Sequence, residues 1–372
     1  MIKVDLRSKA IGPDHNVFLV RPGSNYKLYN TFLESSAIFA DFLGLELDEG
    51  VELKDQDRIT AQLHRAKKLR ALRHTADGPP SRNLDDYADF KDDRSVSQLY
   101  GILRGFFEVA KAGDLVVIPP SSFSQNALIG ELVSGPTEMV TTLYKGERLY
   151  GRSVRWLRQV PRGKLSPYLL DLISKPNAFV LVRNDERPSI YREAYGSYIM
   201  PGEYRARFNV DDPEFTTSDD LYIQAFFNLV VANSKRIREG NPVLGIRDAA
   251  FERVVGSDAM ELQSNINSPG YLNLIGKSLA PLVASALFVL AVTVGPGAVA
   301  AAEQGTILIG NSKDAGDACT VAVHKEVLDH LRLLGVAKWT DACQIAKQAA
   351  DSTGLSGQAQ IVIDSYQQKT GN

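Results

Sequence analysis

The side chains best suited to chemistry in this sequence are the cations and the tryptophan between residues 148 and 164. The run RSVRWL contains Trp156, and arginines flank it on both sides. Guanidinium groups hold the phosphates of a nucleic acid, and stacking of an aromatic ring on a base is worth about 1–3 kcal/mol. This pattern predicts a nucleic-acid-binding surface. Its expected residues are Arg152, Arg155, Trp156, Arg158 and Arg162.

A polar loop just before residue 127 adds groups that read the edge of a base. It has the sequence SSFSQN, whose hydroxyl and amide side chains offer both donors and acceptors. Phe123 lies in the middle of this loop, where a core phenylalanine is less expected, so we expect it to stack on a base. The predicted loop residues are Ser121, Ser122, Phe123, Ser124, Gln125 and Asn126.

Trp156 has a second interpretation as a core residue. Alternation along RSVRWL places Val154 and Trp156 on one face of a strand and Arg155 on the other. If the face of Val154 is inward, Trp156 packs in the core instead of contacting a ligand. The residues alone leave both interpretations open.

The composition limits the functions that the chain can have. Its formal net charge is −2 and its pI is about 6.3, so any nucleic-acid site is a local patch. Two cysteines, Cys319 and Cys343, and five scattered histidines form neither a disulfide framework nor a ligand set for a metal. We therefore predict no cofactor and no metal. The N-terminus lacks the apolar core of a signal peptide, and a cytoplasmic location is expected.

Short strands must position these side chains. Runs typical of β-strands are separated by Pro, Gly and Ser clusters, which favours a small bent sheet or barrel. A helix with apolar residues at helical spacing, residues 96–111, leads directly into this region. The fold class predicted for the whole chain is α+β. The expected strands are Val17–Arg21, Leu115–Ile118, Leu128–Val133, Gly151–Trp156 and Ala178–Val182.

The order of these segments resembles the N-terminal recognition domain of Mrr-like restriction proteins. The similarity covers residues 16–183 and is most specific in GDLVVIPP, IGEL, RSVRWL and the following VPRGKLS. That domain is similar to barrels of the PUA, EVE and YTH type, which bind nucleic acids, several of them at modified bases. The resemblance implies a PUA/EVE-like β-barrel with flanking helices, a DNA or RNA ligand with a modified base, and a role in prokaryotic antiviral defence.

Two features depart from that family. A long acidic loop, residues 75–95, interrupts the barrel domain, and the nuclease half is missing. The sequence lacks an Asp followed at short range by Glu or Gln, one residue and Lys, which a magnesium-dependent nuclease needs. Asp219 and Asp220 instead follow Thr216 at the start of a helix over 219–238, and we favour an N-cap there over a metal site. We therefore expect a non-enzymatic protein.

Residues 279–302 form an apolar segment with two interpretations. They include no charged residue, and about twenty apolar residues suffice to cross a bilayer. Gly295–Pro296–Gly297 is a strong helix breaker, which predicts instead a buried hairpin of two short helices. Insertion into the inner membrane is slightly favoured.

The sequence thus predicts four regions and one leading function. The regions are a recognition domain at 1–185, a connector with helices at 186–258, a strand plus the apolar segment at 259–310 and a helical tail at 311–372. The leading hypothesis is a nucleic-acid sensor coupled to a mostly helical C-terminal region that is membrane-directed or oligomerising. It would act as a homo-oligomer or with a partner protein of a defence operon. The alternatives are a scaffold that assembles through the apolar segment, and an enzyme whose thin candidates are Asp219, Asp220, His324 and Glu326.

Overall fold

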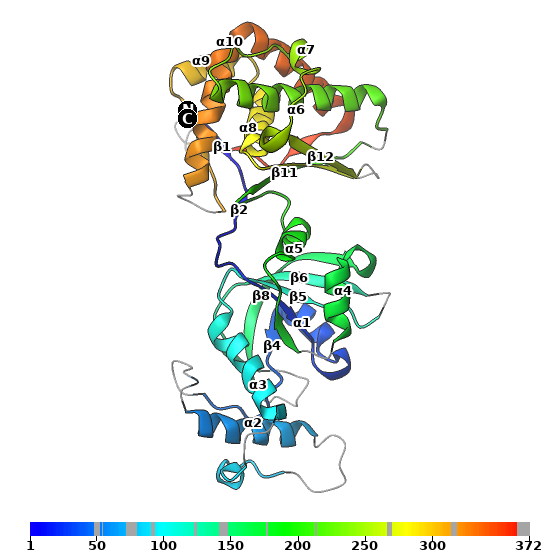
Figure 1. The fold of residues 1–372 in the computed structure, drawn as a ribbon, viewed down its shortest axis with the longest axis vertical. Coiled ribbons are helices and arrows are strands. Elements are labelled where there is room, and N and C mark those ends of the chain that lie inside the picture. Colours follow the sequence, from blue (N-terminus) through cyan, green and yellow to red (C-terminus); the bar gives the residue numbers. More distant parts are fainter. Residues whose placement is uncertain are drawn as a thin grey trace, which may run out of the picture. The chain divides into compact units, whose positions relative to one another are not determined.

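The computed structural model describes residues 1–47, 53, 55–71, 80–90, 94–122, 125–140, 148–175, 178–212, 214–265, 270–313 and 318–362. The chain divides into two compact units (Figure 1). Unit 1 comprises Met1–Pro13 and Tyr195–Asn372, and unit 2 comprises Asp14–Ala194. This division differs from the predicted regions, because residues 1–13 belong to unit 1 and everything from residue 195 onward forms a single unit.

Unit 2 is built on a curled sheet in the form of a half-barrel. The strand order is β4-β8-β6-β5-β3-β9, with β7 also paired to β8. The pair β3 and β5 runs parallel, and the other neighbours run antiparallel. The strands are β3 (Val17–Val20), β4 (Ala37–Phe39), β5 (Leu115–Ile118), β6 (Asn126–Leu132), β7 (Thr137–Val140), β8 (Arg148–Pro161) and β9 (Phe179–Leu181). All five predicted strands of this region are confirmed, with shifts at their ends.

Unit 2 also contains helices. They are α1 (Tyr29–Ser35), α2 (Gln56–Ala71), α3 (Arg94–Arg104), α4 (Pro167–Ser174) and α5 (Arg187–Ala194). Of these, α2 packs against α3. The predicted helix over 96–111 corresponds to α3, which continues as a π-helix over Gly105–Val109. Val96, Leu103 and Phe106 recur at helical spacing and share one core with the strands. This packing fixes α3 against the sheet.

Unit 1 contains more strand than the mostly helical region that the sequence predicts. It has one sheet of order β14-β1-β16 and another of order β12-β13-β11-β10-β2, with β15 paired to β11. The strands are β1 (Ile2–Asp5), β2 (Lys9–Ala10), β10 (Tyr198–Met200), β11 (Glu203–Val210), β12 (Met260–Asn265), β13 (Gly270–Gly276), β14 (Ile307–Gly310), β15 (Ser356–Gly357) and β16 (Gln360–Val362). Several are short and pair with distant parts of the chain, as in Ile2 with Ile307, so local patterns do not reveal them.

The apolar segment forms two of the helices of unit 1, α8 (Ala280–Thr293) and α9 (Gly297–Glu303). Unit 1 also contains α6 (Thr217–Arg238), α7 (Ile246–Ala249) and α10 (Ala318–Thr353), which is kinked at Gly335. Every side chain from Ala280 to Phe288 is buried, and α8 packs against α6, α10 and β11. In the described part of the chain no single helix is both long and apolar enough to span a membrane. The pair α8 and α9, bent by 120°, meets the length and composition requirement only when taken together.

The start of α6 has the cap that its sequence predicts. The hydroxyl of Thr216 accepts a hydrogen bond from the N–H of Asp219 at 3.4 Å, and the Asp219 carboxylate accepts one from the N–H of Thr216 at 2.8 Å. Hydrogen bonds from Ser352 and Thr216 hold the pKa of Asp219 below its ordinary value. The carboxylate therefore serves the helix end, as a capping box does.

Candidate functional site

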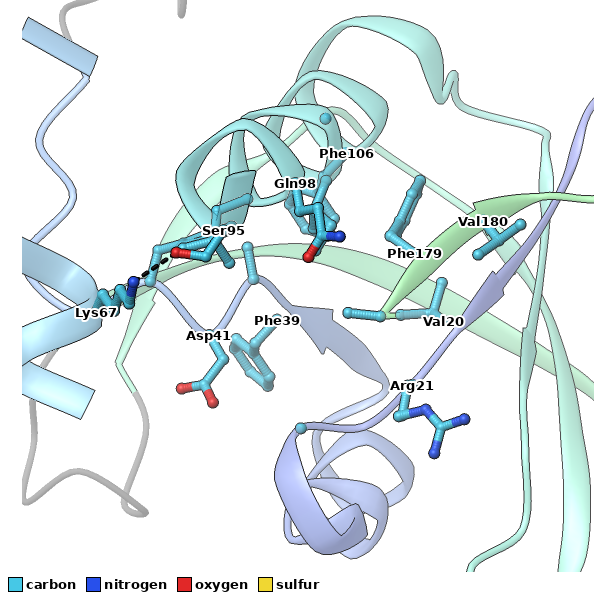
Figure 2. Close-up of a pocket in the computed structure, with 17 residues that line it drawn as sticks. Val20, Arg21, Phe39, Asp41, Lys67, Ser95, Gln98, Phe106, Phe179 and Val180 are labelled. Carbon is cyan, nitrogen blue, oxygen red and sulfur yellow. Dashed lines mark hydrogen bonds between the residues drawn. The ribbon is translucent and has the colours of Figure 1, made fainter. Parts of the chain in front are cut away.

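Unit 2 contains a cavity of about 550 Å³ on the open side of its curled sheet. It lies between the two strands at the ends of the sheet, β4 and β9, and α3 closes it on a third side (Figure 2). This volume, with mostly apolar walls and a few polar groups, is typical of pockets for small molecules or single groups of a larger ligand. Its apolar lining includes Val20, Phe39, Phe42, Leu99, Phe106 and Phe179.

The edges of β4 and β9 direct backbone groups towards the open side of the sheet. Ala40 donates a hydrogen bond to the carbonyl oxygen of Tyr150 at 2.9 Å. Because hydrogen-bonded residues alternate along an antiparallel ladder, the N–H and C=O of Phe39 point away from β8. The carbonyl oxygen of Ala178 likewise accepts a bond from the residue after β3 at 2.8 Å, so the backbone of Phe179 points away from β3. Each edge therefore offers one donor and one acceptor.

Gln98 supplies an amide from the helix. Its side chain extends from α3 into the space between Phe39 and Phe179 (Figure 2). The side chain is exposed, and its amide has no hydrogen-bond partner in the described part of the chain. A glutamine amide carries donors and an acceptor side by side, which matches the edge of a base. Gln98 is therefore the group best placed to read a ligand.

The charged residues around the cavity are engaged by the protein. Lys67 donates to the hydroxyl of Ser95, which Figure 2 shows at the rim. Asp41 forms an ion pair with Lys27 at 3.0 Å. Arg21 donates to the backbone carbonyl oxygens of Ile173 and Lys175 at the C-terminal end of α4, at 2.6 and 2.5 Å. These bonds hold the rim in place and leave the interior nearly uncharged.

Because Gly105 has no side chain, the ring of Phe179 can pack closely against the helix at that position. A Cβ on Gly105 would lie 2.9 Å from Cδ1 of Phe179, closer than such atoms approach. The Phe179 ring also contacts Phe18 and Phe106, with centroids 4.9 and 6.0 Å apart. The π-helix that begins at Gly105 thus sets the position of one wall of the cavity.

The structure contradicts the prediction that Arg152 holds a phosphate. Its side chain is 1% exposed. The guanidinium donates to the carbonyl oxygens of Phe106 at 2.9 Å, Ala110 at 2.6 Å and Ser134 at 3.1 Å. Burial lowers the pKa of Arg152, while the charge of Asp114 raises it. Arg152 therefore satisfies the carbonyl groups at the end of α3 and its π-helix, which the sequence analysis missed.

The other arginines of β8 and the turn after it differ in exposure. Arg155 is exposed and paired with Glu131 at 2.7 Å, and Arg158 is exposed and donates to the carbonyl oxygen of Glu193 at 3.3 Å. Arg162 is half-buried in the turn Arg162–Lys164. These groups lie on the surface of unit 2, where their charge is accessible.

Trp156 has the inward packing of its second interpretation. It is half-buried against the core, and a Cβ on Gly130 would lie 2.7 Å from its ring atom Cε3. Its Nε1 atom is buried without a hydrogen-bond partner among the described residues. The ring therefore packs across the backbone of β6, and the strand alternation explains why.

The described residues of the predicted loop, Ser121, Ser122, Gln125 and Asn126, are not part of the cavity lining. Ser121 donates through its backbone and hydroxyl to the side-chain oxygen of Gln125, and Ser122 is exposed. Asn126 begins β6, and its carbonyl oxygen accepts a bond from the Tyr29 hydroxyl at 2.6 Å. Phe123 and Ser124 fall outside the described residues.

Sequence reasoning missed the cavity residues because they come from distant segments. Phe39, Gln98 and Phe179 belong to β4, α3 and β9, which only the fold brings together. The sequence contained one local indication. Gln98 is a polar residue directly before Leu99, in a helix that was predicted from its apolar residues.

The four residues considered for an enzyme do not form one site. Asp219 caps α6, and Asp220 accepts a hydrogen bond from Gln224 at 2.7 Å. Nδ1 of His324 accepts the N–H of Ile309 at 3.3 Å, and Glu326 lines a separate cavity in unit 1. Over the described ranges, no group of three or more His, Cys, Asp or Glu side chains could hold a metal ion.

The geometry of the cavity in unit 2 and of its lining residues is the basis for a functional proposal. Comparison with protein-family models, with curated proteins and with solved structures gave no match.

Proposed function

We propose that unit 2 is a PUA/EVE-like recognition module that takes one modified base of a DNA or RNA strand into the cavity beside Gln98. In this proposal the chain is a sensor of a prokaryotic defence system and not an enzyme. The observation that carries the proposal is the cavity between β4 and β9, which combines aromatic walls with an amide that has no partner in the described part of the chain.

The chemistry of the cavity favours a flat, uncharged ring. Phe39, Phe106 and Phe179 offer apolar and aromatic surface, while Gln98 and the two strand edges offer hydrogen bonds. A base must leave its stack to enter such a pocket, as enzymes that act on bases require. Apolar walls favour a base with an added methyl group, because each buried methylene is worth about 0.8 kcal/mol.

The exposed cations of β8 and the following turn would hold the strand that carries the base. Arg158 and Lys164 are exposed, and Arg155 keeps most of its side chain in solvent beside Glu131. Contacts of this kind position the backbone without reading its sequence. They also make affinity fall as salt rises, because bound counterions are released.

A binding titration of the full chain tests this proposal. Fluorescence anisotropy would compare single strands and duplexes, with and without a methylated base, at two salt concentrations. We expect salt-sensitive binding that is tighter for one methylated base. Gln98→Ala should weaken it about tenfold or more and remove the preference, because a good bidentate contact to a base is worth about 1–3 kcal/mol.

Gln348→Ala is the matched control, since Gln348 is an exposed glutamine on α10 of unit 1. We expect its affinity to equal that of the wild type. An absence of binding at low salt would overturn the proposal. So would a Gln98→Ala variant that keeps both the affinity and the preference for the methylated base.

In this proposal unit 1 turns binding into a response through assembly of several copies of the chain. Unit 1 carries strongly exposed apolar side chains, among them Phe251 at 91% and Val321 at 70%. In this proposal such exposed side chains make the contacts between copies of the chain.

A further inference from the structure

Unit 1 contains a second cavity, of about 310 Å³, between α6 and α10. Ser234, Ile237 and Arg238 line it from α6. Ala322, Lys325, Glu326, Asp329 and His330 line it from the first half of α10. The cavity is separate from the capped end of α6 and belongs entirely to unit 1.

The charges around this cavity leave one carboxylate without compensation. Arg238 is paired with Asp258 at 2.5 Å, and Lys325 is paired with Asp329 at 2.7 Å. Glu326 has neither a hydrogen bond nor an ion pair to its carboxylate within the described part of the chain. Burial raises the pKa of Glu326, and the charges of Arg238 and Lys325 only partly oppose this. The cavity therefore has an unsatisfied negative charge when Glu326 is ionised.

The deep end of the cavity is polar but neutral. His330 is 1% exposed, and burial lowers its pKa. Both ring nitrogens face polar groups: Nδ1 lies 2.7 Å from the carbonyl oxygen of Glu326, and Nε2 lies 3.3 Å from the carbonyl oxygen of Val230 and 3.4 Å from the hydroxyl oxygen of Ser234. Neither residue supplies a charge that would balance Glu326.

We infer that the cavity between α6 and α10 binds a small organic cation with a primary ammonium group, which the Glu326 carboxylate accepts. An ammonium group is compact and has three donors, and its hydrogen bonds to a carboxylate are about twice as strong as neutral ones. A metal ion fits less well, because the described residues provide no group of three ligands here or elsewhere. The site is independent of the base-binding cavity in unit 2.

Calorimetric titration of the full chain with 1,4-diaminobutane at pH 8 tests this inference. We expect saturable binding to the wild type, and a loss of at least about tenfold in affinity for Glu326→Gln, because hydrogen bonds to charged groups contribute about 1.5–3 kcal/mol. Glu303→Gln is the control, since Glu303 is an exposed glutamate on α9. The uncharged analogue 1,4-butanediol should give no saturable heat.

Protons should compete with the amine, so affinity should fall as pH decreases through the raised pKa of Glu326. Two results would overturn the inference. One is the absence of saturable binding to the wild type at millimolar diamine, and the other is equal affinity for Glu326→Gln. Oligonucleotide binding by Glu326→Gln should equal that of the wild type, which keeps this result separate from the test of unit 2.

Discussion

Arg152 is the residue whose replacement separates packing from contact with a nucleic acid. Its guanidinium donates hydrogen bonds to the carbonyl oxygens of Phe106, Ala110 and Ser134. Replacement by Met keeps an unbranched side chain in place of the inner part of Arg152 but removes the guanidinium donors, which leaves these buried acceptors without their partner. We expect Arg152→Met to lower the free energy of unfolding by about 3 kcal/mol. Urea denaturation followed by circular dichroism would measure this.

Arg158→Met provides the comparison, because Arg158 is exposed on the same strand. Its free energy of unfolding should change by less than about 1 kcal/mol. Under the proposed function, Arg158→Met should also reduce the salt dependence of oligonucleotide binding. A stable Arg152→Met variant with the same loss of salt dependence would contradict this assignment of roles.

The raised pKa of Glu326 leads to a prediction about how the stability of the chain depends on pH. The pKa of Glu326 in the folded chain is raised above the ordinary 4.5, so the folded state binds the proton more tightly than the unfolded state. This contribution to stability is present below pH 4.5 and is lost as pH rises through the raised pKa. Glu326→Gln should therefore melt at the same temperature as the wild type at pH 4 and at a higher temperature at pH 8.

Thermal unfolding between pH 4 and pH 8 would measure this difference, with Glu303→Gln as the exposed control. The control should follow the wild type at every pH. A Glu326→Gln variant that is less stable than the wild type at pH 8 would show that the carboxylate has a stabilising partner after all.

The burial of Arg152 could have been predicted from the alternation already used for Trp156. Residues 152, 154 and 156 lie on one face of the strand, so an inward Val154 places Arg152 inward as well. The charge of arginine favoured the surface, and the acceptors that permit its burial come from the π-helix after α3, from Ala110 at its end and from the turn after β6. Those partners are distant in sequence, and no local pattern indicates them.

At the scale of elements, the π-helix after α3 places Gly105 directly against Phe179, which lines the proposed base-binding cavity. Gly105 is in contact with the Phe179 ring, so a methyl group there must move the ring or the helix. We expect Gly105→Ala to weaken oligonucleotide binding several-fold and to lower the melting temperature. Anisotropy and thermal unfolding of the full chain would measure the two effects.

Gly101→Ala is the matched variant for stability, because a Cβ there meets no atom within 4 Å. We expect Gly101→Ala to raise the free energy of unfolding by up to about 1 kcal/mol, because Ala has a higher helix propensity than Gly. A gain in stability from Gly105→Ala would indicate that Phe179 adjusts without cost.

The elements of unit 2 were predictable, whereas its cavity was not. Short strands with turn residues between them and the apolar face of α3 are local signals, and they gave the correct element types. The cavity depends on which strands end the sheet. Because β4 and β9 are far apart in sequence, only the order β4-β8-β6-β5-β3-β9 makes them border one opening.

The capping box of α6 is a feature that local sequence could predict. Thr216 and Asp219 are three residues apart, so their reciprocal hydrogen bonds follow from local sequence alone. In unit 1, by contrast, β1 pairs with β14 and β16 across more than three hundred residues. Such pairs escape any local pattern, which explains why this region was expected to be mostly helical.

At the scale of the whole molecule, exposed apolar side chains are concentrated in one unit. Of the described large hydrophobic residues that are more than half exposed, all but Val133 belong to unit 1. They are Met1, Leu221, Phe251, Val255, Val321, Leu333 and Val336. Unit 2 carries the proposed base-binding cavity, so the proposed function places binding in unit 2 and assembly in unit 1.

This division predicts that a saturating oligonucleotide increases the mass of the sedimenting species beyond one chain plus one strand. Sedimentation velocity would measure it, with Gln98→Ala as a variant that should stay at the mass of the free protein. Phe251→Ser, which removes the most exposed apolar side chain, should keep oligonucleotide affinity while reducing assembly. A wild-type complex that remains at one chain per strand would contradict assembly as the response. If that same complex then co-sediments with lipid vesicles, the response would be assigned to the apolar pair α8 and α9. In that case α8 must leave its buried position in unit 1 to reach lipid.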